Sequence, residues 1–134
     1  MSKLILLAGA ATLAACSQAE QAPTEQAAAK AAAEAQAEVM AADGKPAYGT
    51  FKVTLGDGQV FTEEVRQDGT YTSTSATGEV ETGTWVQKPG VYCTTEDKEA
   101  AKEECHPETI NEDGIWVSTN SETGKTAIIE RIKG

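Results

Sequence analysis

The sequence predicts an all-β fold in residues 47–134, a small antiparallel meander or barrel of about eight short strands. β-branched and aromatic residues alternate there with polar ones, which is the period-two pattern of half-buried strands. Glycine-containing turns such as Asp68-Gly69 and Asp113-Gly114 recur between these stretches at short spacing. All seven aromatic residues and 15 threonines of the chain lie in these 88 residues. Both residue types favour strands over helices.

Taken in order, the turns delimit eight expected strands, at 48–55, 59–66, 70–75, 79–87, 90–95, 107–111, 114–120 and 125–132. Phe51, Val53 and Leu55 share one face of the first strand, and Trp85 and Trp116 are expected to anchor the core. Further apolar positions are Ile115, Val117, Ile128 and Ile132. With few large side chains in 88 residues, we expect most inward positions to fill the core and to leave no roomy cavity.

A similar pattern occurs twice in this region, at 68–78 and at 113–124. Each copy has a turn, an aromatic residue on a hydroxyl-rich strand and a second turn. A duplicated four-strand unit and two hairpins shaped by the same turn chemistry both explain it.

Residues 1–15 form a separate segment, with Lys3 followed by an apolar run from Leu4 to Ala15. The run is too short to span a bilayer, which takes about 20 residues, and is typical of a secretory signal peptide. It ends in Leu13-Ala14-Ala15-Cys16, which resembles the lipobox of bacterial lipoproteins. The resemblance implies cleavage between Ala15 and Cys16 and acylation of Cys16 by a diacylglyceryl group and a further fatty acid such as palmitate. An ordinary secreted protein with a free Cys16 is the alternative.

A lipoprotein of this kind is held on its membrane by two or three acyl chains, each buried CH₂ adding about 0.8 kcal/mol. In that family the residue after the cysteine directs sorting. Ser17 in this position, rather than aspartate, implies the periplasmic leaflet of the outer membrane in a double-membraned bacterium.

Residues 16–46 are expected to be a tether between the anchor and the β domain. Residues 17–46 contain 12 alanines and no aromatic residue. Thr24 is a candidate cap for a helix over 27–42, and Asp43-Gly44 with Pro46 are stop signals. Because this helix has no apolar stripe to dock, we expect a partly helical tether. A trimeric coiled coil is the alternative, but the a/d heptad that it needs is missing.

Two cysteines remain, Cys93 and Cys105, and the oxidising periplasm predicts a disulfide between them. Closing a loop of this length stabilises a fold by about 3 kcal/mol in chain-entropy terms. The alternative is a metal site that adds His106 and nearby glutamates. Its spacing is wrong, since neither cysteine belongs to a C-x-x-C pair. We therefore expect no metal and no cofactor.

The connection between the cysteines is acidic and helix-compatible over one or two turns. Its acidic residues are Glu96, Asp97, Glu99, Glu103 and Glu104. They form either a docking surface for a cationic periplasmic protein or a solvated loop held by the disulfide.

The charge and the motifs of the sequence argue against two classes of function, nucleic-acid binding and catalysis. The formal charge is −10, of which residues 47–134 carry sixteen acids against eight basic residues, which argues against nucleic acid as a partner. His106 is the only histidine, and Glu63 and Glu64 are adjacent on a strand and so point to opposite faces. Neither pattern suits shared acid–base catalysis. We therefore expect a protein that is not an enzyme.

Asp68-Gly69-Thr70-Tyr71 and Gly83-Thr84-Trp85 match turns of short, alanine-linked, outer-membrane lipoproteins of alphaproteobacteria, which the whole chain resembles. That resemblance implies a non-catalytic structural or accessory binding protein, anchored to the membrane by lipid. Two alternatives stay open. One is an acidic inhibitor of a cationic protein such as lysozyme, and the other is a carrier of a small apolar ligand.

Overall fold

The computed structural model describes residue 26 and residues 39–134. The expectations for the signal segment, for Cys16 and for most of the tether lie outside these residues. Within them, no helix is long and apolar enough to cross a membrane.

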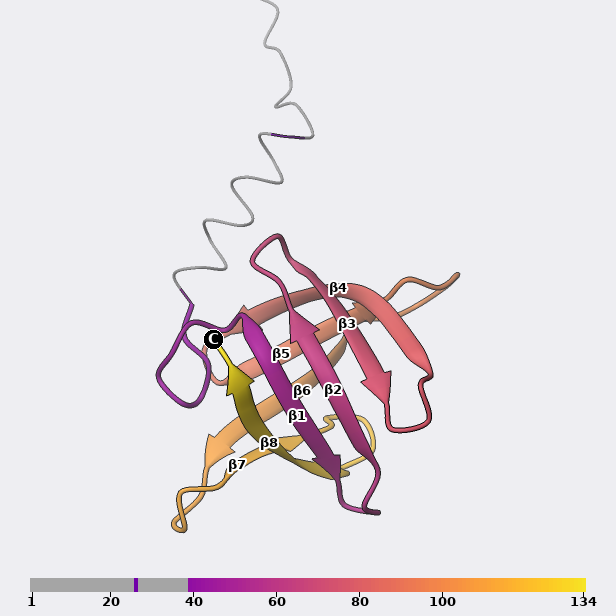
Figure 1. Ribbon diagram of the computed structural model, residues 1–134. Coiled ribbons are helices and arrows are strands. Elements are labelled where there is room, and N and C mark those ends of the chain that lie inside the picture. Colours follow the sequence, from indigo (N-terminus) through magenta and orange to yellow (C-terminus); the bar gives the residue numbers. More distant parts are fainter. Residues whose placement is uncertain (1–25, 27–38) are drawn as a thin grey trace, which may run out of the picture.

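Residues 49–133 form one closed antiparallel barrel (Figure 1). Its strands are β1 (Gly49–Leu55), β2 (Val60–Val65), β3 (Thr70–Ser75), β4 (Val80–Lys88), β5 (Val91–Glu96), β6 (Glu104–Ile110), β7 (Trp116–Thr119) and β8 (Thr126–Lys133). Each strand pairs with the next, and β8 pairs with β1 to close the ring. The expected all-β class and the eight strands are confirmed.

The largest difference from the expected boundaries concerns β6, which begins at Glu104 rather than at 107. Thr94 of β5 pairs with Glu104, and Cys93 pairs with Cys105, so the cross-strand pairing extends further toward the loop than the sequence indicated. The expected helical turns between the cysteines are also wrong. Residues 97–100 form bends and a turn and residues 101–103 are irregular, with Ala100 at a φ of 59°, because the chain must reverse direction within this short connection.

The core lies toward one end of the barrel, where Trp85 and Trp116 are buried as expected. The Trp85 indole Nε1 donates a hydrogen bond to the Arg66 carbonyl oxygen at 2.7 Å. Phe51 meets Trp116 edge to face, with ring centroids 5.6 Å apart. These aromatic side chains form a packed floor across the barrel.

Several aliphatic side chains that the sequence offered to the core lie on the outer surface instead. Ile115, Ile128 and Ile132 are exposed, the last at 59%. In β8 it is Ile129 that packs against the core, because its register partner is the buried Trp116. Neighbouring residues of a strand face opposite sides, so Ile128 must then point outward.

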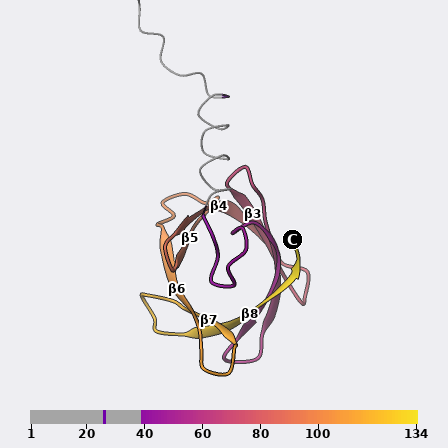
Figure 2. The same cartoon turned by 90° about the vertical axis from the view of Figure 1, so that its left-hand side faces the viewer.

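The chain before β1 closes the end of the barrel that has the aromatic floor. Met40 pairs with Pro46, and the segment enters the ring of strands in Figure 2. Ala41 and Ala47 belong to the core. The expected helix over 27–42 is therefore wrong for its described part, residues 39–42, because this short loop folds back onto the barrel.

Arg131 of β8 holds this loop in place. Its Nε lies 2.6 Å from an oxygen of Asp43, and its Nη2 donates to the other carboxylate oxygen of Asp43 at 2.9 Å. The guanidinium also lies 4.6 Å from the centroid of the Phe51 ring. One buried cation thus joins the incoming chain, β1 and β8.

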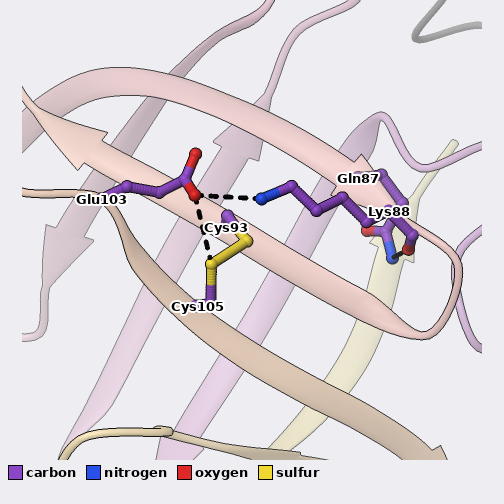
Figure 3. The surroundings of a disulfide bond; sticks show 5 residues. All are labelled: Gln87, Lys88, Cys93, Glu103 and Cys105. Atoms are coloured by element: carbon purple, nitrogen blue, oxygen red, sulfur yellow. Dashed lines mark hydrogen bonds and ion pairs between the residues drawn. A yellow bond between two sulfur atoms is a disulfide. The ribbon is translucent and has the colours of Figure 1, made fainter.

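Cys93 and Cys105 form the expected disulfide, directly across the β5–β6 pair (Figure 3). Lys88 Nζ lies 3.0 Å from Glu103 Oε1, and this ion pair lies beside the two sulfur atoms. The bond confirms the prediction made from the cysteine count.

Replacing both cysteines by alanine is expected to lower the free energy of unfolding by about 3 kcal/mol, because the cross-link restricts the unfolded chain. Urea denaturation of the oxidised protein and of the double variant measures the difference. Equal midpoints for the two proteins would contradict the prediction.

Candidate ligand cavity

The barrel encloses a cavity of about 880 Å³. The expectation that side chains fill the interior is therefore wrong. Many inward positions hold small residues, among them Ser73, Thr94, Ser118 and Ala127, whereas Ile115, Ile128 and Ile132 lie outside. An eight-stranded barrel has a fixed width, so small inward side chains leave room for a ligand.

The cavity is closed at one end and reaches the loops at the other. Because the strands run alternately up and down, the β2–β3, β4–β5 and β6–β7 turns lie with the loop of 39–48 at the closed end. The remaining turns surround the opposite end, which we call the mouth. Asp57, Thr123 and Lys125 line the cavity from these turns, and all three are exposed.

One wall of the cavity is apolar. Val53 and Leu55 of β1, Phe61 of β2 and Ile129 of β8 line it, and Trp116 lies toward the floor. The shared face of Phe51, Val53 and Leu55 predicted from the sequence is thus confirmed as an inner face. This wall can accept a hydrocarbon or aromatic group.

The rest of the cavity is strongly acidic. Among the described residues that line it, six carry carboxylates and one is a lysine, Lys125. The acidic residues are Asp57, Glu63, Glu81, Glu96, Glu104 and Glu108. Strand direction places Glu81, Glu96 and Glu104 near the mouth, Glu63 halfway down and Glu108 near the floor.

Two tyrosines orient the carboxylates. The Tyr92 hydroxyl donates to Glu63 Oε1 at 2.5 Å, and the Tyr71 hydroxyl donates to Glu81 Oε1 at 2.7 Å. Gly83, the register partner of Tyr71, is required for this arrangement. A Cβ there would lie 2.7 Å from Tyr71 Cε1 and 2.1 Å from the carbonyl oxygen of Thr95.

Burial controls the protonation of Glu63. Removal from water raises the pKa of this carboxyl, the Tyr92 hydrogen bond opposes that rise, and the nearby Glu81 charge adds to it. Burial and the adjacent carboxylates also raise the pKa of both tyrosines, so that their hydroxyls stay protonated and donate. A carboxylate accepts several hydrogen bonds, so Glu63 keeps acceptor capacity beyond Tyr92.

Glu108 is the second deep carboxyl. Burial raises its pKa to about 7, although the Gln87 amide and the Trp116 indole favour the charged form. Gln87 Nε2 donates to Glu108 Oε2 at 3.3 Å. The indole Nε1 is buried and makes no hydrogen bond within the described part of the chain, so its interaction with Glu108 is electrostatic rather than a bond of full geometry.

His106 also faces the cavity, although it follows Cys105 directly. Burial lowers its pKa, and the charge of Glu104 opposes this effect.

The expected absence of a metal site at the cysteines was argued from spacing. In the structure Cys93, Cys105 and Glu103 do bring donor atoms together, but the two sulfur atoms are bonded to each other and are not thiolates.

The acidic loop does not present one continuous surface. Glu96 and Glu104 line the cavity mouth, where Glu96 is paired with Lys98, and Glu103 is paired with Lys88 on the outer surface. Asp97 accepts a hydrogen bond from the Thr82 hydroxyl at 3.1 Å. Glu99 is exposed. The candidate residues named from the sequence are thus divided between the cavity and the outer surface.

The deep residues of the cavity, Glu63 and Glu108, were not named as binding residues from the sequence. A signal for Glu63 was present, since it lies two residues from both Phe61 and Val65 and so shares their face. For Glu108 the alternation in β6 is uninformative, because few apolar residues mark its inner face.

Comparison with protein-family profiles, with curated proteins and with solved structures found no match.

The raised pKa of Glu108 predicts a pH-dependent stability. Its pKa lies near 7 in the folded chain against 4.5 when solvated, so ionisation costs folding free energy from about pH 4.5 upward and the full cost is reached above 7. Glu108→Gln removes this cost. We expect the variant to gain on the order of 2 kcal/mol over the native chain at pH 8, and much less at pH 5. Urea denaturation at both pH values tests this, and a gain that is equal at the two would refute it.

Proposed function

We propose that this chain is a non-catalytic binding protein that carries a small, partly apolar molecule in its barrel. The observation that supports the proposal is the cavity of about 880 Å³, closed at one end and reaching the loops at the other. Sites of this size bury a small organic molecule almost completely. The carrier hypothesis is thus favoured over the purely structural one, for which the cavity has no use.

The alternative of an acidic inhibitor of a cationic protein needs a continuous acidic surface. The loop proposed for that role turns Glu96 and Glu104 toward the cavity and pairs Glu103 with Lys88. The same acids are better placed to act on a molecule that enters the mouth.

A tryptophan placed inside the cavity is expected to block binding. Ser73 lines the cavity, and Thr74, the next residue of β3, faces the opposite side. N-phenyl-1-naphthylamine, an uncharged apolar dye, is titrated into the full chain and its fluorescence followed. We expect saturable 1:1 binding that Ser73→Trp weakens by roughly tenfold or more, because the indole occupies the dye's space.

Thr74→Trp is the matched control, with the same added side chain on the outer face, and should bind the dye as the native chain does. Equal binding by both variants, or no saturable binding by the native chain, would overturn the carrier proposal.

We propose further that the carrier acts on the periplasmic side of the outer membrane, held there by acyl chains on Cys16. The support is the lipobox Leu13-Ala14-Ala15-Cys16 and the Ser17 that follows it. A carrier on a tether can collect or deliver apolar molecules close to a membrane.

Cys16→Ser removes the acylation site, so we expect the variant to carry no acyl chains. It should be recovered either as a soluble protein or as a precursor whose signal segment is not cleaved. Labelling of expressing cells with an alkyne fatty acid measures acylation directly, and a Cys93→Ala/Cys105→Ala variant is the control that keeps Cys16. Label retained after Cys16→Ser would exclude this anchor.

A further inference from the structure

We infer that the ligand is an organic cation, an amine or a similar positively charged group attached to an apolar body. The inference rests on the proposed carrier function and specifies which molecules the cavity selects. It follows from the cavity's two walls and from the depth and hydrogen bonding of its carboxyl groups.

The charge of the lining excludes one common class of barrel ligand. Six carboxylates face one lysine among the described lining residues, and Lys125 lies at the mouth rather than inside. A fatty acid or other organic anion placed inside would meet Glu63 with no cation to offset the repulsion. A positive group would find complementary charge along the whole depth of the cavity.

The deep carboxyl groups are positioned rather than mobile. Tyr92 holds Glu63 at 2.5 Å, and Gln87 holds Glu108 at 3.3 Å. Both neighbours donate hydrogen bonds, which favour a charged carboxylate fixed in direction, whereas burial opposes ionisation and raises the pKa of both groups. A cation bound beside them would favour the charged form. Because these carboxylates are already oriented, a ligand N–H donor can bind them at a small cost in conformational entropy and replace the hydrogen bonds to water that burial removes.

The floor next to Glu108 is formed by Trp116, whose side chain is only 7% exposed and whose indole nitrogen has no hydrogen-bond partner among the described residues. A buried donor without a partner is uncommon in native proteins. An ammonium group has no lone pair to accept this N–H, so the indole donor does not itself select a cation. Its effect is on Glu108, whose charged carboxylate it favours. The Trp116 ring also presents aromatic surface to a cation, whereas the Phe51 ring already carries the Arg131 guanidinium.

The carboxylates at the mouth add negative charge at the entrance of the cavity. Glu81, Glu96 and Glu104 lie near the opening beside Lys98 and Lys102, and Glu96 is paired with Lys98. The three acids exceed the two lysines, so this side of the mouth keeps a net negative charge that would attract a cation. The apolar wall of Val53, Leu55 and Phe61 then lies opposite the acids and receives the hydrocarbon part. The cavity therefore has a place for each half of an amphipathic cation.

The test compares three ten-carbon probes that differ only in the head group: decylammonium, 1-decanol and decanoate. The full chain carries Cys16→Ser, which removes the acyl chains as competing apolar groups, and displacement of N-phenyl-1-naphthylamine is followed at pH 8 and 150 mM salt. We expect decylammonium to bind roughly tenfold or more tightly than 1-decanol, because its N–H groups form charge-assisted hydrogen bonds, and decanoate to bind most weakly.

Glu63→Gln should weaken decylammonium binding by roughly tenfold and leave 1-decanol binding unchanged, because only the cation loses its counter-charge. Glu64→Gln is the matched control: it removes the same charge from the adjacent position of β2, which faces outward and pairs with Arg66. Glu108→Gln gives a second, independent variant if the first unfolds, and circular dichroism establishes that each variant is folded.

The outcomes separate the two proposals. If no probe binds, the carrier function is wrong. If 1-decanol binds as tightly as decylammonium, the carrier function stands and the cation inference is wrong. An equal loss in Glu63→Gln and Glu64→Gln would assign the preference to surface charge and would also overturn the inference.

Discussion

The pairing of β1 with β8 is the constraint on which the rest of the structure depends. It joins the first strand to the last, with Val53 opposite Ile129 and the Lys52–Glu130 ion pair, at 2.6 Å, on the outer face. Once the ring is closed there are no strand edges, and the width of the interior is fixed by the number of strands rather than by the side chains. Because the strands hold the width, the barrel does not collapse when the inner side chains are too small to fill it. The cavity is a consequence of closure combined with small inward residues.

Closure of one end has a different origin, in the chain that precedes the barrel. Arg131 binds Asp43 and lies over Phe51, so the incoming loop is fixed to both strands of the closing pair. Burial acts to raise the pKa of Asp43, but the hydrogen bonds from Arg131 and Lys45 outweigh it and the pKa is lowered. This ion pair is therefore maintained down to acidic pH.

The sequence predicts the fold far better than the cavity, for a physical reason. Alternation and turns locate strands, and seven aromatic residues in one region identify a core, so the strands and the roles of Trp85 and Trp116 follow directly. Which face of a strand points inward depends on register. Ile128 and Ile129 are adjacent and equally apolar, so the sequence of β8 does not show which of them points inward. The pairing of Ile129 with the buried Trp116 determines that Ile129 does. The volume of the interior depends on such decisions in every strand.

The carboxyl groups inside the barrel are costly to the fold, and this cost argues for a role in binding. Burial raises the pKa of Glu63 and of Glu108, which means that ionising either one destabilises the folded chain. An aliphatic side chain at either position would fill part of the cavity and avoid that cost. The disulfide between β5 and β6 stabilises the strands that carry Tyr92 and Glu108 and offsets part of it. A positively charged ligand would remove the remaining penalty, since each carboxylate would then be buried with a counter-ion. Interior acids that destabilise the empty barrel and stabilise the loaded one are therefore a means of making stability depend on the ligand.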